Sequence, residues 1–210
     1  MTQAREDAEA ARKLFAGPCD FIWGATSVDN LPPATLPEIA FVGRSNAGKS
    51  SLLNALTGRK TLARVSHTPG RTRQINFFNL GDKIVLADLP GYGYAKASKS
   101  LAEEWQNLIF AYLRGRTALR RVAVLIDARR SAMDTDREAM RLLDEAAVSY
   151  ALVLTKMDQL KPAERVKVEA DIAAEAKHHT AAYPDIFATS ALKNLGLDAL
   201  KTHLAALAAY

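Results

Sequence analysis

The chain has 210 residues, of which 28 are Lys or Arg and 23 are Asp or Glu, giving a net charge of +5. This length suits one domain with a sizeable core, and the mild basic excess permits a polyanionic partner without requiring one. The single cysteine, Cys19, excludes a disulfide within the chain, and no apolar run reaches the roughly 18 residues of a membrane span. Because the charged N-terminus also lacks the apolar core of a signal peptide, we expect a cytoplasmic protein with no membrane contact.

Residues 1–37 precede the predicted core. Residues 1–16 are rich in Ala, Glu and Arg and predict a short exposed helix or a frayed tail, so we treat 1–20 as a charged arm and 21–210 as a single domain. The sequence Phe-Ile-Trp at 21–23 predicts an additional edge strand. Residues 30–37 contain three prolines, which exclude a helix and indicate a linker into the first core strand.

From residue 38 onward, predicted strands and helices alternate. Strands are expected at 38–42, 74–80, 83–88, 122–127, 151–154 and 186–189. Helices are expected at 51–57, 98–116, 134–146, 161–177 and 195–209. The turn at 79–82 predicts that the second and third of these strands form an antiparallel pair at the edge of an otherwise parallel sheet. This order predicts a doubly wound α/β domain of the P-loop NTPase type, with helices on both faces and ligands at the carboxyl ends of the strands.

Residues 43–50 read GRSNAGKS and match the pattern G-x-x-x-x-G-K-[ST] of a phosphate-binding loop. The pattern stands between a predicted strand and a predicted helix, which is the context that it requires. Gly43 and Gly48 allow the backbone to turn tightly and approach oxygens, Lys49 can reach the β- and γ-phosphates, and the Ser50 hydroxyl can ligate Mg²⁺. A chance match is the alternative, and the flanking elements weigh against it. The predicted phosphate ligands are Gly43, Arg44, Ser45, Asn46, Ala47, Gly48, Lys49 and Ser50.

A second motif, Asp-Leu-Pro-Gly, ends the third predicted strand. An aspartate at this place can reach Mg²⁺ through a water molecule, and the amide of the glycine can meet a γ-phosphate. A simple turn at the end of a strand is the alternative. Its position one strand pair after the phosphate loop favours the functional interpretation, which covers Asp88, Leu89, Pro90 and Gly91.

Two motifs near the C-terminus predict a base site. Thr155, Lys156, Met157 and Asp158 follow a strand and resemble the guanine-reading motif [NT]-K-x-D. The Asp158 carboxylate can accept hydrogen bonds from guanine N1 and N2, which adenine does not offer, and the Lys156 stem can lie on the base. Most GTPases have Asn where this chain has Thr155, so one base contact is expected to be weaker.

The segment that ends the last predicted strand could brace the same base through its backbone. The tripeptide Thr-Ser-Ala is very weak evidence by itself, and only its position at the end of the last predicted strand supports this interpretation. The residues concerned are Thr189, Ser190 and Ala191.

A threonine that closes on Mg²⁺ and the γ-phosphate only when GTP is bound is expected between the first helix and the hairpin. Thr72 is preferred to Thr68 for this role, and a plain polar loop is the alternative. Many small GTPases also have a Gln after the D-x-x-G motif, where this chain has Tyr92. Slow intrinsic hydrolysis is therefore expected, with Lys49, Thr72 and Gly91 as catalytic candidates. Asn46 could hold a K⁺ ion beside the phosphates, or could simply stabilise the loop.

The motifs resemble those of the bacterial EngB family of GTPases, also called YihA or YsxC, in the TrmE-Era-EngA-EngB-septin group. The resemblance runs from about residue 20 to the C-terminus. Its most specific parts are the loops TPGRT and DLPGYGYA. Met157 stands where the family often has Ala, and the charged arm at 1–16 is longer than the family core needs.

The resemblance implies a single-domain cytoplasmic protein that binds GTP and Mg²⁺, supports late assembly of the large ribosomal subunit on rRNA, and is needed for normal septation. It implies Ser50 and Thr72 as protein ligands of Mg²⁺, with Asp88 acting through water, and it strengthens the K⁺ hypothesis for Asn46. It further implies a first switch formed by Gly70, Arg71, Thr72, Arg73 and Gln74. No feature indicates an oligomer, so a monomer is expected.

Basic residues give two further expectations. The loop 59–73 contains no acid and could meet rRNA phosphates, as could a second group, for which a solvated face is the slightly favoured alternative. That second group is Arg114, Arg116, Arg120 and Arg121. The competing function is a GTP-dependent binding module for protein partners in cell division, with incidental turnover. An ATPase or kinase is disfavoured by Asp158.

Overall fold

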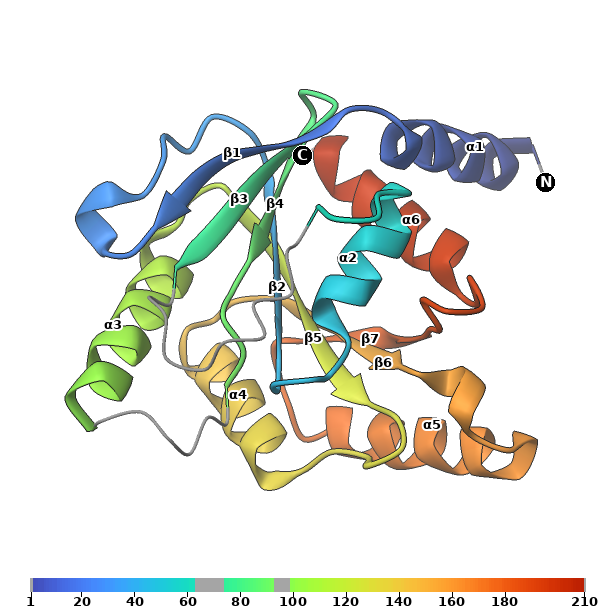
Figure 1. Ribbon diagram of the computed structural model, residues 1–210. Helices are drawn as coiled ribbons and strands as arrows, with labels where there is room; N and C mark the ends of the chain where they lie inside the picture. The colour runs from blue at the N-terminus through green and yellow to red at the C-terminus, as the bar shows by residue number, and fades with distance from the viewer. Residues whose placement is uncertain (1, 63–73, 93–98, 210) are drawn as a thin grey trace.

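The computed structural model describes residues 2–62, 74–92 and 99–209, with side chains described for 107–208 in the last range. One sheet has the strand order β1-β3-β4-β2-β5-β6-β7 (Figure 1). Its strands are β1 (Cys19–Ala25), β2 (Glu38–Gly43), β3 (Ile75–Leu80), β4 (Ile84–Asp88), β5 (Leu119–Asp127), β6 (Tyr150–Thr155) and β7 (Ala182–Ala188). The helices are α1 (Thr2–Ala16), α2 (Lys49–Thr57), α3 (Lys99–Gly115), α4 (Asp134–Glu145), α5 (Pro162–Ala176) and α6 (Leu197–Ala206). Short 3₁₀ segments lie at Val28–Asn30, Met157–Gln159 and Leu207–Ala209.

The sheet is mixed and mostly parallel, as predicted. Strand β3 pairs antiparallel with both β1 and β4, while β4, β2, β5, β6 and β7 pair in parallel. The predicted hairpin and the predicted strand at 21–23 are therefore confirmed. The hairpin itself does not form the edge of the sheet, because β1 covers β3 on its outer side.

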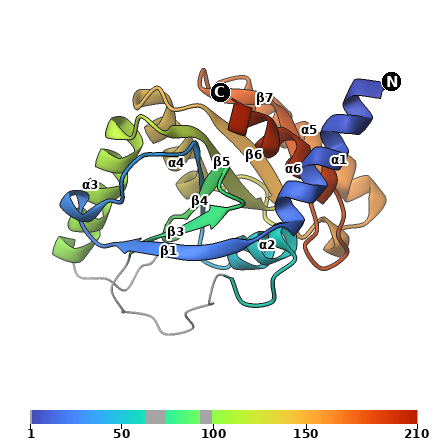
Figure 2. The same cartoon turned by 90° about the horizontal axis from the view of Figure 1, so that it is seen from above.

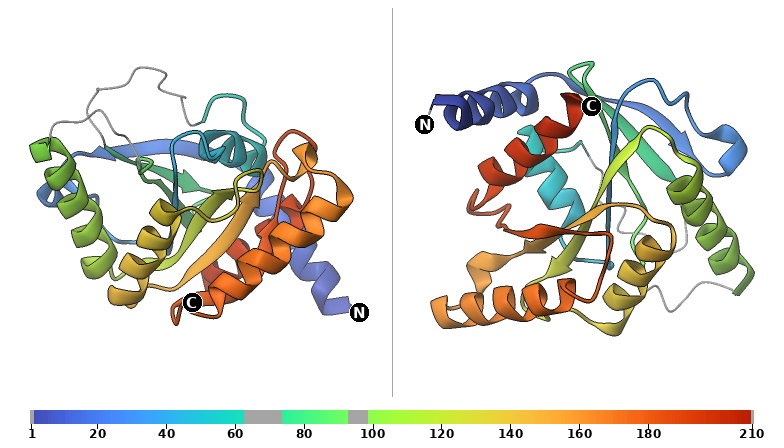
Figure 3. Two further views of the ribbon diagram at one scale, coloured as in Figure 1. Left: turned by 90° about the horizontal axis from the view of Figure 1, so that it is seen from below. Right: turned by 180° about the vertical axis from the view of Figure 1, so that it is seen from behind.

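Helices cover both faces of the sheet, which gives three layers (Figures 2 and 3). Helices α3, α4 and α5 bury their apolar side chains on one face, and α1, α2 and α6 bury theirs on the other. The apolar stripe predicted for 98–116 is confirmed over its described part. Leu108, Ile109, Tyr112 and Leu113 are all buried against the sheet.

The N-terminal arm forms a helix with one buried face. Helix α1 packs beside α6 (Figure 1), and Phe15 and Ala11 are fully or almost fully buried. Arg12 lies 3.5 Å from the Asp198 carboxylate of α6, although both side chains are at least half exposed. The proposed boundary between residues 20 and 21 falls inside strand β1. Burial of Phe15 in the same cluster as β2 and α2 gives this arm a stabilising role.

Strands β5 and β7 begin three and four residues earlier than predicted, because their first few residues include arginines or a proline. Strand β5 starts at Leu119 and includes Arg120 and Arg121, and β7 starts at Ala182 and includes Pro184. Proline removes a backbone donor, so it argues against a central strand, but an edge strand tolerates it. The position of β7 at the end of the sheet explains why Pro184 is accommodated.

A buried ion pair secures the end of the sheet opposite the phosphate loop. Arg116 donates through Nε to both oxygens of the Glu38 carboxylate at 3.0 and 2.9 Å, and Tyr112 donates to the same carboxylate at 3.0 Å. Arg116 also donates to the Pro32 carbonyl at 2.7 Å, which ties the linker to this cluster. The two predictions for Arg116 are a solvated face and a contact with rRNA. Both interpretations are wrong, because its side chain is only 8% exposed and pairs with Glu38.

The predicted motifs follow the ends of strands β2, β4, β6 and β7, which lie at one edge of the sheet because these strands run in parallel. This edge is where the doubly wound fold places ligands. Within the described ranges, no helix is both long enough and apolar enough to cross a lipid bilayer.

Candidate functional site

The loop between β2 and α2 turns sharply, and its backbone requires two unusual conformations. Asn46 has φ 65° and Gly48 has φ 93°, both in the left-handed region. The Ala47 amide donates to the Arg44 carbonyl at 2.9 Å, which closes the turn. Helix α2 then starts at Lys49, so its free backbone amides face the concave side of the loop. This geometry is suited to an anion with several oxygens.

Lys49 and Asp88 form an ion pair at the base of this loop. Lys49 Nζ donates to Asp88 Oδ1, and the two side chains are only 14% and 11% exposed. Ser50 is half-buried in the same first turn of α2. A hydroxyl together with a nearby carboxylate is an oxygen donor set that suits Mg²⁺, which usually keeps several waters and takes few protein ligands. Ser50 and Asp88 therefore fit the predicted metal site.

The segment after β4 runs directly along the phosphate loop. The Tyr92 amide donates to the Gly43 carbonyl at 3.2 Å, and the Ser45 amide donates to the Tyr92 carbonyl at 3.2 Å. A Cβ on Gly91 would lie 3.0 Å from the Gly43 oxygen and 3.2 Å from the Ser45 nitrogen. Glycine favours this close approach, because a Cβ would push the backbone of the two loops apart by a few tenths of an ångström. The structure thus brings the predicted γ-phosphate sensor against the predicted phosphate loop.

The side chain of Tyr92 points toward α4. Its hydroxyl donates to Asp136 Oδ1 at 2.7 Å, and the buried Asp136 carboxylate also accepts the Met133 amide at 2.9 Å. Burial, together with the neighbouring Asp136 charge, raises the pKa of Tyr92 well above its usual value. Tyr92 therefore stays protonated and anchors its loop, and Asp136 is a partner that the sequence did not reveal.

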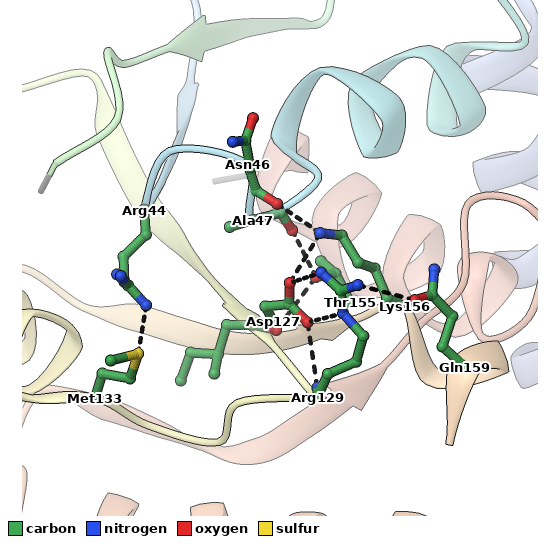
Figure 4. A network of polar contacts seen from close by, with 10 residues as sticks. Arg44, Asn46, Ala47, Asp127, Arg129, Met133, Thr155, Lys156 and Gln159 are labelled. Carbon is green, nitrogen blue, oxygen red and sulfur yellow. Dashed lines mark hydrogen bonds and ion pairs between the residues drawn. The ribbon is translucent and has the colours of Figure 1, made fainter. Parts of the chain in front are cut away.

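The base motif holds the phosphate loop from the other side. Thr155 Oγ1 donates to the Ala47 carbonyl at 2.6 Å, and Lys156 Nζ donates to the Asn46 carbonyl at 2.6 Å and to Asp127 Oδ2 at 2.8 Å (Figure 4). Two consecutive side chains of this motif thus bind two consecutive carbonyls of the loop. The Thr155 hydroxyl directs its only proton to backbone carbonyls, that of Ala47 and, at 3.3 Å, that of Ile126.

A cavity of about 160 Å³ lies between the phosphate loop and the last strand. The residues that line it include Gly48, Lys156, Thr189 and Ala191. Asp158 lies at the same cavity, where Ser190 Oγ donates to its Oδ1 at 2.5 Å. Asp158 Oδ2 accepts no bond among the described residues, so this carboxylate has acceptor capacity for a donor in the cavity.

The T-S-A segment and the T-K-M-D segment are joined through their backbones. The Thr189 amide donates to the Leu154 carbonyl at 2.7 Å, and the Met157 amide donates to the Thr189 carbonyl at 3.1 Å. The Met157 side chain is 1% exposed and packs in the core, so Met157 can serve the site only through its backbone. The two predicted base-site segments therefore form one unit.

The carboxylate of Asp127, at the end of β5, is the centre of a charged network that the sequence analysis missed. Arg129 contacts it through Nε at 2.9 Å and Nη2 at 2.6 Å. Burial opposes ionisation of this carboxylate, but the hydrogen bonds from Arg129 and Lys156 outweigh it and hold the pKa of Asp127 well below its usual value. The sequence Asp-Ala-Arg-Arg at 127–130, where a predicted strand ends, was the signal from which this network could have been found.

Of the predicted first switch, the structure describes Gln74. Gly70, Arg71, Thr72 and Arg73 lie outside the described residues, as does Thr68. Gln74 lies just before β3, where its Nε2 donates to Asn76 Oδ1 at 2.7 Å.

Comparisons with known proteins agree with this geometry. Residues 38–156 match a protein-family model described as 50S ribosome-binding GTPase. The chain is 54% identical over 211 aligned positions to a probable GTP-binding protein EngB of Rhodospirillum rubrum, with 98% of this chain and 91% of that protein covered.

Two solved structures show the same fold. A probable GTP-binding protein EngB has a TM-score of 0.65 at 22% identity, covering 82% of this chain and 98% of the other. Era in complex with MgGDPNP and nucleotides 1506–1542 of 16S ribosomal RNA has a TM-score of 0.62 at 25% identity, covering 82% of this chain and 56% of the other. Because the family model spans more than half of the chain and the curated relative spans almost all of it, the chain belongs to the EngB family of GTPases.

Proposed function

We propose that this chain is a slow GTPase that acts in the cytoplasm, as a monomer, as a GTP-dependent switch in assembly of the large ribosomal subunit, with a link to septation and cell division. The observation that carries the proposal is the unit formed by Thr155, Lys156, Ala47 and Asn46. It joins an anion-binding turn to a cavity that contains Asp158. A nucleotide spanning both parts would place its phosphates in the loop and its base beside the carboxylate.

Guanine selection rests on Asp158. Its carboxylate accepts hydrogen bonds only, so it favours a base that presents two adjacent N–H donors and disfavours adenine. The Ser190 hydroxyl holds the carboxylate in place through Oδ1. The Lys156 stem passes close to Gly48 at the cavity wall, where its Cε lies 3.6 Å from the position of a Cβ on Gly48.

Phosphate binding requires an exchange of partners at Lys49. In the structure its ammonium pairs with Asp88, and phosphate oxygens would take over that ammonium. Asp88 would then be free to orient a water on Mg²⁺, and the Ser50 hydroxyl would be a direct ligand. A magnesium ion in this place supplies charge neutralisation of the phosphates. Thr72 is proposed as the second protein ligand of Mg²⁺ in the GTP-bound state.

The Gly91 amide is proposed to sense the γ-phosphate. The Ser45 amide donates to the Tyr92 carbonyl, so a phosphate that binds near Ser45 would compete with this carbonyl for the Ser45 amide. Gly91 would then shift relative to the phosphate loop, and the residues that follow it would carry the change to a partner. The other predicted residues of the first switch are proposed to change conformation together with the residues that follow Gly91; they are Gly70, Arg71, Arg73 and Gln74.

Asn46 is proposed as a K⁺ ligand. Its backbone is fixed in the left-handed conformation, and its carbonyl is bound by Lys156. Figure 4 shows its side-chain amide pointing away from Lys156 and Asp127, and the residue is exposed. The amide oxygen is therefore available to a cation beside the phosphates, whose charge would stabilise the transition state. Faster GTP turnover in KCl than in NaCl, and loss of that difference in Asn46→Ala, would support this role. Equal rates in both salts would exclude it.

The ribosomal partner is proposed from the family model and from the Era complex with ribosomal RNA. The test is co-sedimentation with purified large ribosomal subunits in the presence of GDP or a non-hydrolysable GTP analogue, over a series of salt concentrations. Pelleting that requires the GTP analogue and weakens steeply with salt is the expected result. Absence of pelleting with both nucleotides, while GTP binding is intact, would contradict the ribosomal role.

A second function has one specific observation in its favour. Strand β1 presents Phe21, Ile22 and Trp23 with 56%, 43% and 47% of their surface exposed, and nearby Val28 is 46% exposed. Neighbouring exposed apolar side chains are typical of protein-binding surfaces. A GTP-dependent module for protein partners in cell division is therefore the alternative, and its binding need not fall with salt.

A further inference from the structure

We propose that Asp127 is a positioning residue of the guanine-nucleotide site, which acts by holding Lys156 between the base cavity and the phosphate loop. This inference rests on the proposed nucleotide site. Asp127 itself contacts no predicted ligand-binding atom. It lies at the end of β5, whereas the motifs that read phosphate and base follow β2 and β6.

The carboxylate of Asp127 is fully used by two cations. Its Oδ2 accepts Lys156 Nζ at 2.8 Å and Arg129 Nη2 at 2.6 Å, and its Oδ1 accepts Arg129 Nε at 2.9 Å and the Arg129 amide at 3.2 Å. The side chains of Asp127 and Lys156 are 12% and 22% exposed, whereas that of Arg129 is 41% exposed, so the bond to Lys156 is better shielded from water than the bonds to Arg129. Arg129 fixes the carboxylate by a two-point contact, and the fixed carboxylate fixes the Lys156 ammonium.

The Lys156 ammonium has a second partner, the Asn46 carbonyl at 2.6 Å. Asn46 has φ 65°, in the left-handed region, which asparagine enters more readily than most residues but which is still less favourable than the right-handed region. The lysine therefore stabilises the unusual turn of the phosphate loop while its stem lines the base cavity near Gly48. Figure 4 shows the continuous path from Arg129 through Asp127 and Lys156 to Asn46.

Arg129 extends the same network to the residue after Asp158. Its Nη1 donates to Gln159 Oε1 at 3.0 Å, so the end of β5 is connected to both sides of the base motif. Removal of the Asp127 charge would leave Lys156 and Arg129 as neighbouring cations with no anion between them. Lys156 would then leave the Asn46 carbonyl and turn toward solvent, and both the loop and the cavity wall would lose their support.

This role predicts a particular pattern of binding. The network touches the base cavity and the Asn46 end of the loop, and it does not touch Gly91 or Lys49. GDP and GTP should therefore be weakened by the same factor, on the order of tenfold. The selectivity for guanine over adenine should persist, because Asp158 and Ser190 are unchanged.

The decisive experiment is a double-mutant cycle on nucleotide dissociation, using the full chain and fluorescent GDP and GTP analogues. Asp127→Ala and Lys156→Ala are measured singly and together, and Asp127→Asn serves as a second variant in case Asp127→Ala folds poorly. If Asp127 acts through Lys156, either Asp127 substitution speeds release of both nucleotides by the same factor in the wild-type background and has no further effect in the Lys156→Ala background. Multiplicative effects of the two substitutions would overturn the proposal.

Two controls separate the inference from other failures. Asp134→Asn removes an aspartate whose side chain is 95% exposed on α4, and its release rates should equal those of the wild type. A general loss of stability would change the fraction of protein that binds, without a matched change in the two release rates. Asp158→Asn tests the base site itself. If this variant keeps its preference for guanine, the assignment of the nucleotide site is wrong. If it loses the preference but the effects of the Asp127 and Lys156 substitutions are independent of each other, only the positioning role of Asp127 is wrong.

Discussion

The Tyr92 hydroxyl lies 2.7 Å from the Asp136 carboxylate, and this hydrogen bond links the loop of the predicted γ-phosphate sensor to the start of helix α4. The backbone of the same residue pairs with Gly43 and Ser45 in the phosphate loop. Tyr92 is thus held at both ends, between the phosphate loop and a helix on the face of the sheet that α3, α4 and α5 cover. A glutamine at this position orients water in many GTPases, whereas the tyrosine here orients the loop itself.

Tyr92→Phe should therefore slow GTP turnover several-fold and leave GDP affinity unchanged, because only the contact to Asp136 is removed and GDP has no γ-phosphate for this loop to sense. Single-turnover hydrolysis and GDP titration measure the two effects. Tyr183→Phe on strand β7 is the matched control and should behave as the wild type. An equal loss of GDP affinity in Tyr92→Phe would mean that Tyr92 supports the whole site and not the γ-phosphate loop.

Asp158→Asn should lower affinity for GTP by on the order of a hundredfold, because an amide at this position loses both the charge and one acceptor for the guanine N–H groups. The same change should improve binding of xanthosine triphosphate, whose base presents a carbonyl where guanine has its amino group. Competition titrations with the two nucleotides measure the exchange of preference. Unchanged preference for GTP would contradict the assignment of the base site.

The Glu38 and Arg116 pair makes a prediction about stability. Arg116→Met should lower the free energy of unfolding by about 3–5 kcal/mol, because it leaves a carboxylate that is 1% exposed without its cation. Urea denaturation of the nucleotide-free protein measures the change. Arg114→Met on the same helix is the control: Arg114 is exposed and lies over the Phe110 ring, and its loss should cost less than about 1 kcal/mol. Similar values for the two variants would show that the buried pair adds little.

His203 gives a pH dependence of stability. Burial, with a smaller contribution from nearby Arg121, lowers the pKa of His203 from its usual 6.5 to about 4, while Asp185 acts weakly in the opposite direction. Between these two values the unfolded chain binds a proton that the folded chain does not, so stability should fall as pH decreases from about 6.5 to about 4. His203→Gln should reduce this slope in urea unfolding measured across that range. An identical slope in the variant would assign the pH dependence to other groups.

Motifs that depend on local sequence were predictable, and contacts between distant segments were not. The turn at 43–50 and the hairpin at 79–82 carry their geometry in glycines and neighbouring residues, so both were found from sequence. Asp127 and Asp136 acquire their roles only because β5 and α4 place them beside Lys156 and Tyr92, which are 29 and 44 residues away in the chain. Arg116 was misread for the same reason, since its partner Glu38 is 78 residues away.

Calorimetric titration of the chain with Mg²⁺ and GTP, GDP or ATP, repeated on Lys49→Ala, tests the proposed guanine-nucleotide site as a whole. GTP and GDP should bind, and ATP should not. Lys49→Ala should lose affinity by at least on the order of a hundredfold, because the ammonium that would move from Asp88 to the phosphates is gone. Lys83→Ala, in the exposed turn before β4, should bind as the wild type does. Tight GTP binding by Lys49→Ala, or equal binding of ATP by the wild type, would show that this is not a guanine-nucleotide site with Lys49 on the phosphates.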